Sequence, residues 1–390
     1  MECTSCLNDS NKRPATLLVE GGRRKVWRRR LVNPPVERAS TILFDSVAEL
    51  EKARPELGEY NYGLQGTATQ WALSDALTEL EPGAAGTALY SSGLAAITAA
   101  LLSVLSEGDE VLVTDSVYGP TRKFCEAILE RFGVSTRYYD PLVGSGIAEI
   151  VSDKTRAILL ESPGSHTMEI QDVPAICAIA RERGIVTLID NTWATPLFFQ
   201  AMAAGVDISI LAATKYVGGH ADVMVGTATA TEPYFERLQR TSWDLGHALS
   251  PDDAWLASRG LRTMGVRLRQ HETSALKVAH WLKQQPRVGV VLHPALPDCP
   301  GHALWKRDFK GSSGLFAFEL KADAAAFVDR LELFGIGYSW GGYESLALPV
   351  RPFRTVSKPP AENLVRLHIG LEDPDDLIED LARSFAALPE

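Results

Sequence analysis

Seven short apolar runs, most of them separated by helical patterns, limit the fold of this chain more than any other feature. Parallel strands need a crossover between them, usually a helix, so this alternation predicts an α/β fold with a largely parallel sheet covered by helices on both faces. Ligands of such sheets bind at the carboxyl ends of the strands. The runs cover residues 87–90, 110–114, 136–139, 157–161, 185–190, 208–211 and 223–227.

A different pattern begins after residue 262 and predicts a smaller C-terminal α+β domain. We assign residues 67–262 to the domain that carries the seven runs and residues 263–390 to this second domain. The elements expected in the second domain are a long amphipathic helix over 264–284, a loop over the proline-rich residues 286–300, a strand over 315–320, a helix over 322–334, a strand over 364–369 and a final helix from Pro374.

Charge and composition exclude several classes of protein. The 390 residues include 49 acidic and 39 basic side chains, and the net charge of −10 argues against nucleic acid as the main partner. No apolar run approaches the ~20 residues of a membrane-spanning helix, and the N-terminus lacks the apolar core of a signal peptide. We therefore predict a cytoplasmic protein that does not bind a membrane.

The five cysteines do not suggest a disulfide framework, and their odd number fits a reducing compartment. Cys3 and Cys6 form a C-x-x-C pair, but no second pair follows. A terminal tail is therefore favoured over a zinc or redox site. No histidine pair has the spacing of metal ligands either, so no metal is expected.

Two of the apolar runs each lead to a single ionisable residue. Asp190 ends one run, and Lys215 follows the next run along the chain. A lysine at a strand end can form a Schiff base with an aldehyde, and a carboxylate from the preceding strand can pair with a protonated pyridine nitrogen. The pair therefore suits pyridoxal phosphate (PLP). Taken alone it is weak support, because such residues often only begin solvated loops.

A Ser-Ser-Gly turn and a tyrosine could serve the same cofactor. Ser92, Gly93 and Leu94 open an alanine-rich helix, whose free N–H groups and positive dipole end can hold a phosphate. An ordinary serine N-cap is the alternative. Tyr118 follows the run at 110–114, where its ring could stack on the pyridine or simply anchor a loop.

With these residues, a series of longer motifs resembles the Cys/Met metabolism family of PLP-dependent enzymes. The resemblance covers nearly the whole chain, from residues 32–36 to 367–373, and is strongest to the bacterial cystathionine β-lyase branch of that family. The motifs are Glu161-Ser162-Pro163-Gly164-Ser165 with Met168-Glu169, Asp190-Asn191-Thr192-Trp193-Ala194, Ala213-Thr214-Lys215-Tyr216 with Gly219-His220, Ser258-Arg259-Gly260-Leu261-Arg262-Thr263, and Tyr338-Ser339-Trp340-Gly341-Gly342-Tyr343-Glu344-Ser345.

The resemblance implies fold type I of the PLP-dependent enzymes, with a mostly parallel seven-stranded sheet. It also implies β-elimination of cystathionine to homocysteine, pyruvate and ammonia. Trp340 after Ser339, and Pro120 in the loop after Tyr118, favour this branch over the γ-lyases and γ-synthases. A broader cysteine-S-conjugate β-lyase is an alternative with the same chemistry. A non-catalytic regulator with this fold would have no reason to retain Lys215.

Roles for individual residues follow from the same resemblance. Lys215 and Tyr118 are expected to be catalytic, with Lys215 holding PLP and acting as general base, and Asp190 is expected to contact the pyridine nitrogen. Arg366, which lies on the opposite face of its strand from the apolar residues, is expected to bind the substrate's carboxylate. The other expected contacts are Ser92, Gly93, Leu94, Thr214 and Tyr62 for the cofactor, and Ser339 and Trp340 for the substrate.

Residues 1–66 are implied to form an N-terminal arm that contacts a neighbouring subunit in a homotetramer with shared active sites. Tyr62 of this arm is expected to reach the cofactor phosphate of the partner. Leu64 and Gln65 replace two arginines of the family motif, one at the phosphate and one at the distal end of cystathionine. The sequence therefore leaves the strength of phosphate binding and the choice of substrate open.

Overall fold

The computed structural model describes residues 12–389, so Cys3 and Cys6 lie outside the described residues. The larger of its two sheets has seven strands in the order β1-β7-β6-β5-β4-β2-β3. Six of them run in the same direction, and only β7, which pairs antiparallel with both β6 and β1, runs the opposite way, so the predicted mostly parallel sheet is confirmed. The strands are β1 Gly86–Tyr90, β2 Glu110–Thr114, β3 Ser135–Tyr139, β4 Thr155–Glu161, β5 Val186–Asp190, β6 Ile208–Leu211 and β7 Gly226–Ala230.

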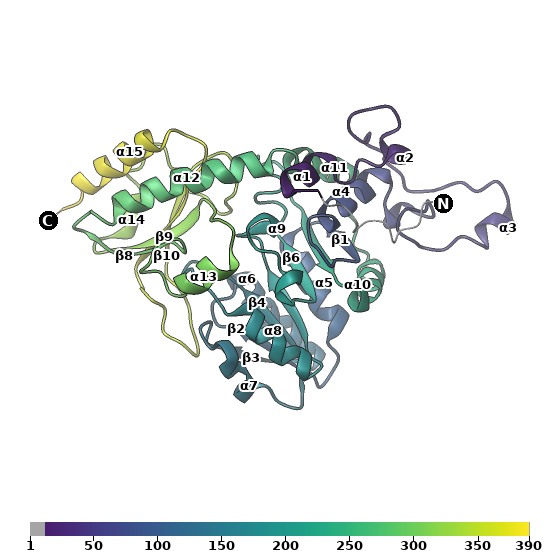
Figure 1. Ribbon diagram of the computed structural model, residues 1–390, viewed down its shortest axis with the longest axis horizontal. Coiled ribbons are helices and arrows are strands. Elements are labelled where there is room, and N and C mark those ends of the chain that lie inside the picture. Colours follow the sequence, from purple (N-terminus) through teal and green to yellow (C-terminus); the bar gives the residue numbers. More distant parts are fainter. Residues whose placement is uncertain (1–11, 390) are drawn as a thin grey trace.

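Helices cover both faces of this sheet (Figure 1). In β4, Ile158 and Leu160 pack in one apolar cluster with α8, while Ala157 and Leu159 pack in a second cluster with α5. Successive side chains of a strand point to opposite faces, so an uninterrupted apolar strand is buried on both. The helices in this part of the chain are α4 Ala68–Thr78, α5 Gly93–Val104, α6 Gly119–Phe124, α7 Ile147–Ile150, α8 Val173–Glu182, α9 Thr195–Phe198, α10 Glu232–Asp244 and α11 Pro251–Leu261.

A four-stranded antiparallel sheet, in the order β10-β11-β9-β8, lies in the C-terminal part of the chain. Helix α12 joins the two parts, because Leu268 packs in the core of the large sheet and Leu282 in the core of the small one. No described helix, α12 included, is long and apolar enough to cross a membrane. The elements are β8 Val288–Leu292, β9 Leu315–Leu320, β10 Leu346–Val350 and β11 Leu364–His368, with α12 Met264–Leu282, α13 His302–Asp308, α14 Ala324–Val328 and α15 Pro374–Ala386.

One strand prediction and one loop prediction are wrong. The last strand of the large sheet covers residues 226–230 rather than 223–227, because its antiparallel pairing with β1 begins at Gly226. The predicted loop over 286–300 contains β8. Val291 and Leu292 are buried where β8 pairs with β9, so an apolar run between the prolines determines the local structure.

The helix predicted over 322–334 is also wrong in its length, since α14 ends at Val328. The N–H groups of Glu332 and Leu333 donate to the buried carboxylate of Asp380 at 3.1 and 2.9 Å. These bonds replace the carbonyl acceptors that a continuing helix would supply, and they fix the chain to α15 instead.

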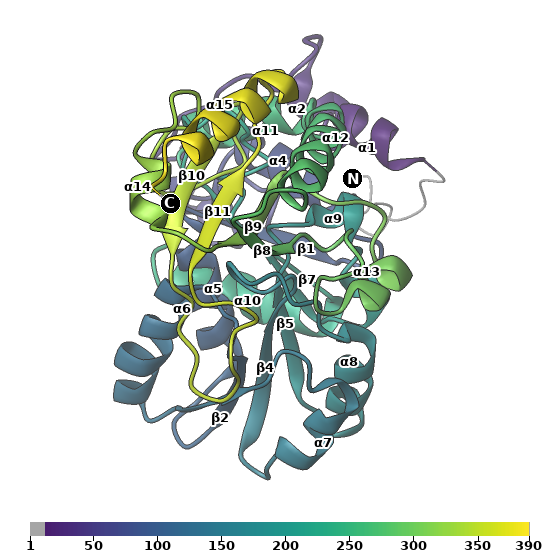
Figure 2. The same ribbon diagram turned by 90° about the vertical axis from the view of Figure 1, so that its left-hand side faces the viewer.

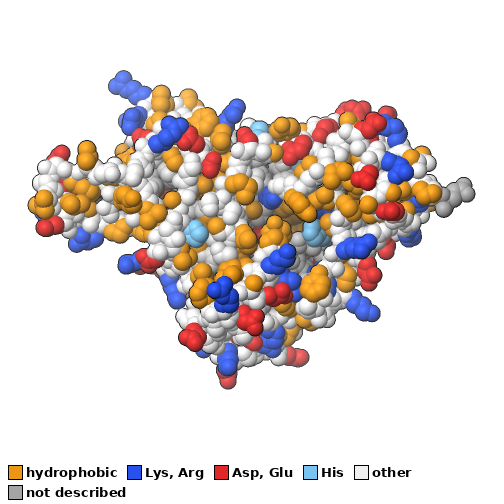
Figure 3. All heavy atoms as spheres, turned by 180° about the vertical axis from the view of Figure 1, so that it is seen from behind, with side chains coloured by type: hydrophobic (Ala, Val, Ile, Leu, Met, Phe, Trp, Pro, Cys, Tyr) orange, Lys and Arg blue, Asp and Glu red, His pale blue; other side chains and the backbone are white. Residues whose placement is uncertain are grey.

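The N-terminal segment has a packed part and a projecting part. Arg24 forms an ion pair with Asp75 of α4, and the ring of Trp27 lies 6.4 Å from that of Trp71. The residues around α3 project from the body of the molecule (Figure 1). Hydrophobic side chains are visible on this projection in the space-filling view (Figure 3). Leu43 there is 90% exposed. The helices of this segment are α1 Pro14–Glu20, α2 Lys25–Arg28 and α3 Val47–Leu50.

Gly226 allows the start of β7 to approach the chain that enters α5. A β-carbon at this position would lie 1.9 Å from the carbonyl oxygen of Ser92 and 2.8 Å from the nitrogen of Gly93. Because overpacking typically costs about 1–3 kcal/mol, we expect Gly226→Ala to lower the melting temperature by several degrees in calorimetry. Gly119→Ala is the control, since no atom lies within 4 Å of a β-carbon there. Equal melting temperatures for the two variants would contradict this packing argument.

Candidate active site

Three neighbouring strands bring ionisable side chains to one edge of the large sheet. Glu161 ends β4 and Asp190 ends β5, and these two residues are in register. Asp190 is also in register with Ile210 of β6, from which the chain continues to Lys215. Because the three strands are parallel, their carboxyl ends meet at the edge where ligands of such sheets bind.

Lys215 is placed by a tight turn after β6. The N–H of Ala212 donates to Thr192 Oγ1 at 2.8 Å, and the N–H of Lys215 donates to the carbonyl of Ala212 at 2.9 Å. Burial and then the charge of Arg366 lower the pKa of the Lys215 amine to about 8, although Asp190 acts in the opposite direction. An amine with this pKa is readily deprotonated and can act as a general base near neutral pH.

A loop from the C-terminal part of the chain lies against Lys215. The Nζ atom donates to Ser339 Oγ at 2.6 Å and lies 5.3 Å from the centre of the Trp340 ring. The loop comes close because of Gly341, whose φ is +87°. A β-carbon on Gly341 would lie 3.0 Å from the backbone of Lys215. The structure therefore brings Ser339 and Trp340 to the predicted lysine across more than a hundred residues of sequence.

Arg366 lies on β11 and reaches the same loop. Its guanidinium donates to the carbonyl oxygens of Ser339 at 3.0 Å and Gly337 at 3.4 Å. Its Nε atom is buried and has no hydrogen-bond partner among the described residues. Burial lowers the pKa of Arg366 to about 10, so the group is still charged at neutral pH. A buried cation with a free donor is suited to bind a carboxylate.

Tyr118 follows β2, and its backbone is fixed by a residue to which the sequence analysis gave no role. The N–H of Tyr118 donates to Glu161 Oε2 at 2.7 Å. Burial, followed by the charge of Asp190, raises the pKa of Glu161 well above its usual value. Its position could have identified Glu161 from the sequence, because it ends the strand that precedes the strand of Asp190 in the chain.

Thr192 is a second functional candidate that the sequence analysis did not single out. Its N–H donates to Asp190 Oδ1 at 3.0 Å, and its hydroxyl donates to the same oxygen at 2.5 Å. Burial raises the pKa of Asp190, while these two hydrogen bonds and the charge of Lys215 act against that rise. Thr192 therefore orients the carboxylate and favours its ionised form.

The N-terminus of α5 lies beside the turn after β6. Ser92 is the N-cap of the helix, and its Oγ accepts from the N–H of Ala95 at 3.1 Å. Gly93 makes the close approach, because a β-carbon there would lie 2.5 Å from Cβ of Ala212. The N–H groups of Gly93 and Leu94 in the first turn have no acceptor within the helix and are oriented to bind an anion.

Thr214 and Tyr62 differ from the other predicted cofactor residues. The Thr214 hydroxyl accepts from the N–H of Val225 at 2.9 Å and donates to its carbonyl at 3.2 Å, so it joins the turn before Lys215 to the start of β7. Tyr62 lies in the arm, pairs with Thr41 and is 52% exposed.

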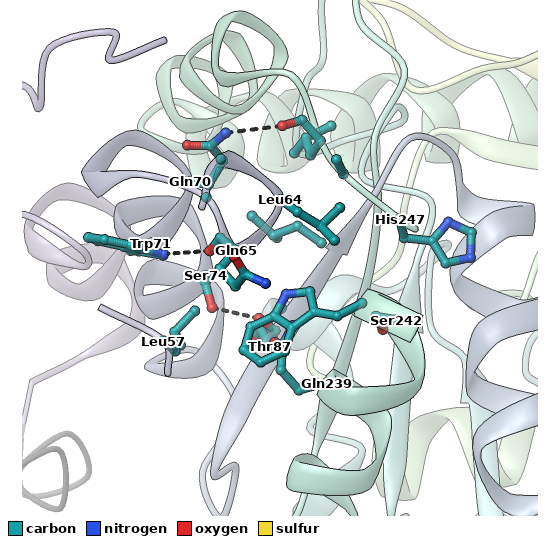
Figure 4. Close-up of a pocket in the computed structure, with 16 residues that line it drawn as sticks. Leu57, Leu64, Gln65, Gln70, Trp71, Ser74, Thr87, Gln239, Ser242 and His247 are labelled. Carbon is teal, nitrogen blue, oxygen red and sulfur yellow. Dashed lines mark hydrogen bonds between the residues drawn. The ribbon is translucent and has the colours of Figure 1, made fainter. Parts of the chain in front are cut away.

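The neighbours of Tyr62 line a different pocket. Leu64 and Gln65 lie there beside Trp71 of α4 and His247, which follows α10 (Figure 4). The Trp71 indole donates to the Gln65 carbonyl at 2.9 Å. Lys215 is not among the residues that line this pocket.

The cluster around Lys215 fits PLP in the chemistry of its donors. A half-buried amine with a lowered pKa is available to the aldehyde, and Asp190 is available to the pyridine nitrogen. The start of α5 presents N–H groups for the phosphate. The unpartnered Nε of Arg366 leaves a donor for the carboxylate of an amino acid.

Comparisons with known proteins agree with this cofactor. The model of the Cys/Met metabolism PLP-dependent enzyme family matches residues 15–386. A putative cystathionine beta-lyase of Rhizobium johnstonii is 50% identical and covers 91% of this chain and 91% of its own length. The cystathionine beta-lyase of Escherichia coli is 46% identical over 97% of this chain and 100% of its own. The crystal structure of a cystathionine gamma-lyase from Lactobacillus plantarum gives a TM-score of 0.88 at 28% identity, covering 97% of this chain and 99% of that one.

The pKa of Lys215 can be measured in the cofactor-free protein. We expect one lysine to titrate near pH 8 in NMR spectra of the reductively methylated protein, because burial and Arg366 both disfavour its charged form. Replacing Arg366 with Met removes a neighbouring cation and should raise this pKa. The spectrum of Lys215→Met identifies the resonance by its loss. A Lys215 midpoint at the value of an exposed lysine, about 10.4, would contradict the description of the site.

Proposed function

The chain belongs to the Cys/Met metabolism family of PLP-dependent enzymes, and we propose that it is a carbon–sulfur lyase that cleaves cystathionine by β-elimination. The products are homocysteine, pyruvate and ammonia, and one water molecule is consumed. When bound, PLP supplies a conjugated ring that accepts the electron pair of the substrate's Cα–H bond. The similarity to the two cystathionine beta-lyases supports the choice of substrate.

One observation carries this proposal, namely the half-buried Lys215 amine held at 2.6 Å from Ser339 Oγ, together with an arginine whose Nε is free. The amine is a base of suitable strength, because its pKa is about 8. The arginine is a site for the α-carboxylate. A substrate fixed there by its carboxylate presents its Cα–H to the amine.

Each of the residues around Lys215 then has its own role in the reaction. Arg366 binds and orients the amino acid, and Lys215 removes the Cα proton. The protonated Lys215 can return a proton to the sulfur that leaves Cβ. Asp190 would hold the pyridine nitrogen of PLP, Tyr118 would cover the ring, and the start of α5 with Thr214 would bind the phosphate.

The surroundings of Lys215 favour β-elimination over γ-elimination. A γ-lyase must remove a second proton, from Cβ, so its base must reach two carbon atoms. Here the Nζ atom donates to Ser339, and the Trp340 ring lies 5.3 Å away and packs against Tyr216. These contacts restrict the amine to a small region, which suits removal of the Cα proton alone.

Gln65 bears on the selectivity for cystathionine, because it replaces the arginine of the family motif that is associated with the distal end of this substrate. Its side chain carries no charge, and it lies in the segment that we propose to reach the partner's active site. A charge-assisted hydrogen bond to a carboxylate contributes roughly 1.5–3 kcal/mol. In its absence, we propose that the enzyme accepts S-alkyl cysteines almost as well as cystathionine.

We further propose a homotetramer, built from two dimers whose active sites are shared. The projecting segment around α3 supports this assembly, because Leu43 and Val47 are 90% and 70% exposed in the single chain. Burying such apolar side chains against a second subunit is favourable. Cys125, Cys177 and Cys299 are buried free thiols, which supports a location in the reducing cytoplasm.

The product pair tests the reaction directly. We expect cystathionine to yield pyruvate and homocysteine, identified by mass spectrometry, and not the 2-oxobutyrate and cysteine that γ-elimination would give. We also expect kcat/KM for cystathionine to exceed that for S-methylcysteine by less than about tenfold, since the neutral Gln65 has no charge with which to select the distal end.

Two variants provide the controls for this assay. Lys215→Ala should lose a factor of at least about 10³ in kcat, because it lacks the base. The exposed Lys321→Ala should retain full activity. Formation of 2-oxobutyrate as the main product would reassign the reaction, and ordinary activity of Lys215→Ala would refute the assignment of the base.

Shared sites can be tested by mixing two inactive variants. Tyr62→Ala and Lys215→Ala subunits that exchange at random should form mixed dimers with one fully wild-type site, so about a quarter of wild-type activity should return. Each variant alone is the control. If native mass spectrometry verifies subunit exchange and activity does not return, Tyr62 does not act across the interface.

A further inference from the structure

The loop between β10 and β11, residues 351–363, leaves the small sheet and lies along the edge of the large one (Figure 2). It is bonded there to Asp115, which directly follows β2. The N–H groups of Thr355, Val356 and Ser357 all donate to the Asp115 carboxylate, at 3.0, 2.8 and 3.0 Å. Three consecutive backbone donors therefore enclose one carboxylate.

The Asp115 side chain is fully buried and is also paired with Arg122, whose guanidinium donates to Asp115 Oδ1 at 2.6 Å. Although burial opposes ionisation, the three backbone N–H groups and Arg122 lower the pKa of Asp115 to about 2. The carboxylate is therefore ionised at every pH at which the enzyme would be assayed.

Asp115 and Arg122 stand on either side of Tyr118. Besides the ion pair, the guanidinium donates to the Asp115 carbonyl at 3.0 Å, and the N–H of Arg122 donates to the Tyr118 carbonyl at 3.1 Å. These bonds connect the two ends of the short segment that carries Tyr118. The β10–β11 loop is hydrogen-bonded to the Asp115 carboxylate at one of these ends.

A second buried ion pair fixes the same loop. Arg354 lies 2.8 Å from Glu169, and only 4% of each side chain is exposed. Arg354 also donates to Thr167 Oγ1 at 2.5 Å. Glu169 in turn accepts from the N–H of Gly164 through its carbonyl, so this pair attaches the loop to the chain that follows Glu161.

The other end of the loop leads into β11, which carries Arg366. We propose that Asp115, Arg122, Arg354 and Glu169 form a clasp that fixes Tyr118 relative to Arg366, and that these four are positioning residues for the reaction. The clasp joins the group that would cover the cofactor ring to the group that would hold the substrate's carboxylate. This inference rests on the proposed roles of Tyr118 and Arg366.

The test is Asp115→Asn in the cofactor-loaded enzyme, which keeps the shape of the side chain and removes its charge. The matched control is Asp380→Asn. Asp380 is also fully buried, accepts backbone N–H groups, and is paired with Arg383 at 2.9 Å, but it lies on α15 and binds residues 332 and 333, away from the clasp. Both variants remove a charge from the same kind of site, so only a positioning role separates them.

We expect Asp115→Asn to raise KM and lower kcat, with kcat/KM falling by about tenfold to a hundredfold, because small misplacements of reacting groups have effects of that size. Asp380→Asn should lower the melting temperature without changing kcat/KM. Loss of activity in both variants, or in neither, would overturn the positioning role.

Hydrogen exchange gives a readout that does not depend on turnover. In Asp115→Asn we expect faster exchange at the amides of residues 355–357 and also at the amide of Tyr118, which donates to Glu161. Unchanged exchange at Tyr118 would overturn the clasp even if residues 355–357 are released. If wild-type protein shows no lyase activity, the proposed function fails, while this exchange pattern still decides the clasp.

Thr355→Val is a second variant that tests the clasp if Asp115→Asn does not fold. Thr355 is exposed, and the substitution removes the hydroxyl that donates to Asp115 at 2.9 Å and accepts from Arg122 at 3.5 Å, while keeping the backbone donors. We expect a smaller change of the same kind in exchange at Tyr118 and in kcat/KM. No change in either would overturn the proposal.

Discussion

The site depends on a half-buried lysine amine whose proton affinity is lowered by a neighbouring guanidinium. Two cations at short range disfavour each other's protonation, and of the two only the lysine can lose its proton near neutral pH. Arg366 and burial together lower the pKa of Lys215 to about 8, while Asp190 limits the shift. The same arginine that would bind the substrate thus lowers the pKa of the base. A carboxylate bound at Arg366 would offset its charge and change the basicity of Lys215 at the moment of binding.

This proximity requires two parts of the chain that are far apart in sequence. Lys215 is placed by the register of β5 and β6, whereas Ser339 and Arg366 belong to the small sheet and its loop. One apolar cluster lies within each part, but a third contains residues of both, among them Leu211 and Leu315. Neither part holds a complete site. Apolar packing therefore joins the two parts, and the polar contacts of Lys215 and Arg366 with the loop at Ser339 fix the local geometry of the site.

The sequence predicted what is encoded locally or by motif. Strand ends identified Asp190 and Lys215, and a serine before an alanine-rich helix identified the N-cap at Ser92. The position of β7 was missed, because its register is set by a partner more than a hundred residues away. The contacts of Asp115 were missed for the same reason, since an aspartate after a strand has no local sign that a distant loop will donate three N–H groups to it.

Glu161 and Thr192 show an intermediate case. Both belong to motifs that the sequence analysis quoted, but their roles follow from side-chain directions that a motif does not specify. Thr192 points back to Asp190, and Glu161 points across to the backbone of Tyr118. Sequence position could suggest that such residues lie near the site, but not which atom each one would bind.

Helix α12 has a mechanical consequence. Its 19 residues extend about 28 Å from the core of one part to the core of the other. Near its start, Arg267 donates to the carbonyl of Tyr216, the residue after Lys215, at 2.8 Å. A continuous helix is stiff along its axis, so a displacement of the small sheet cannot be absorbed along α12. A displacement of the small sheet along α12 would therefore be transmitted to Tyr216, the residue next to the reactive lysine.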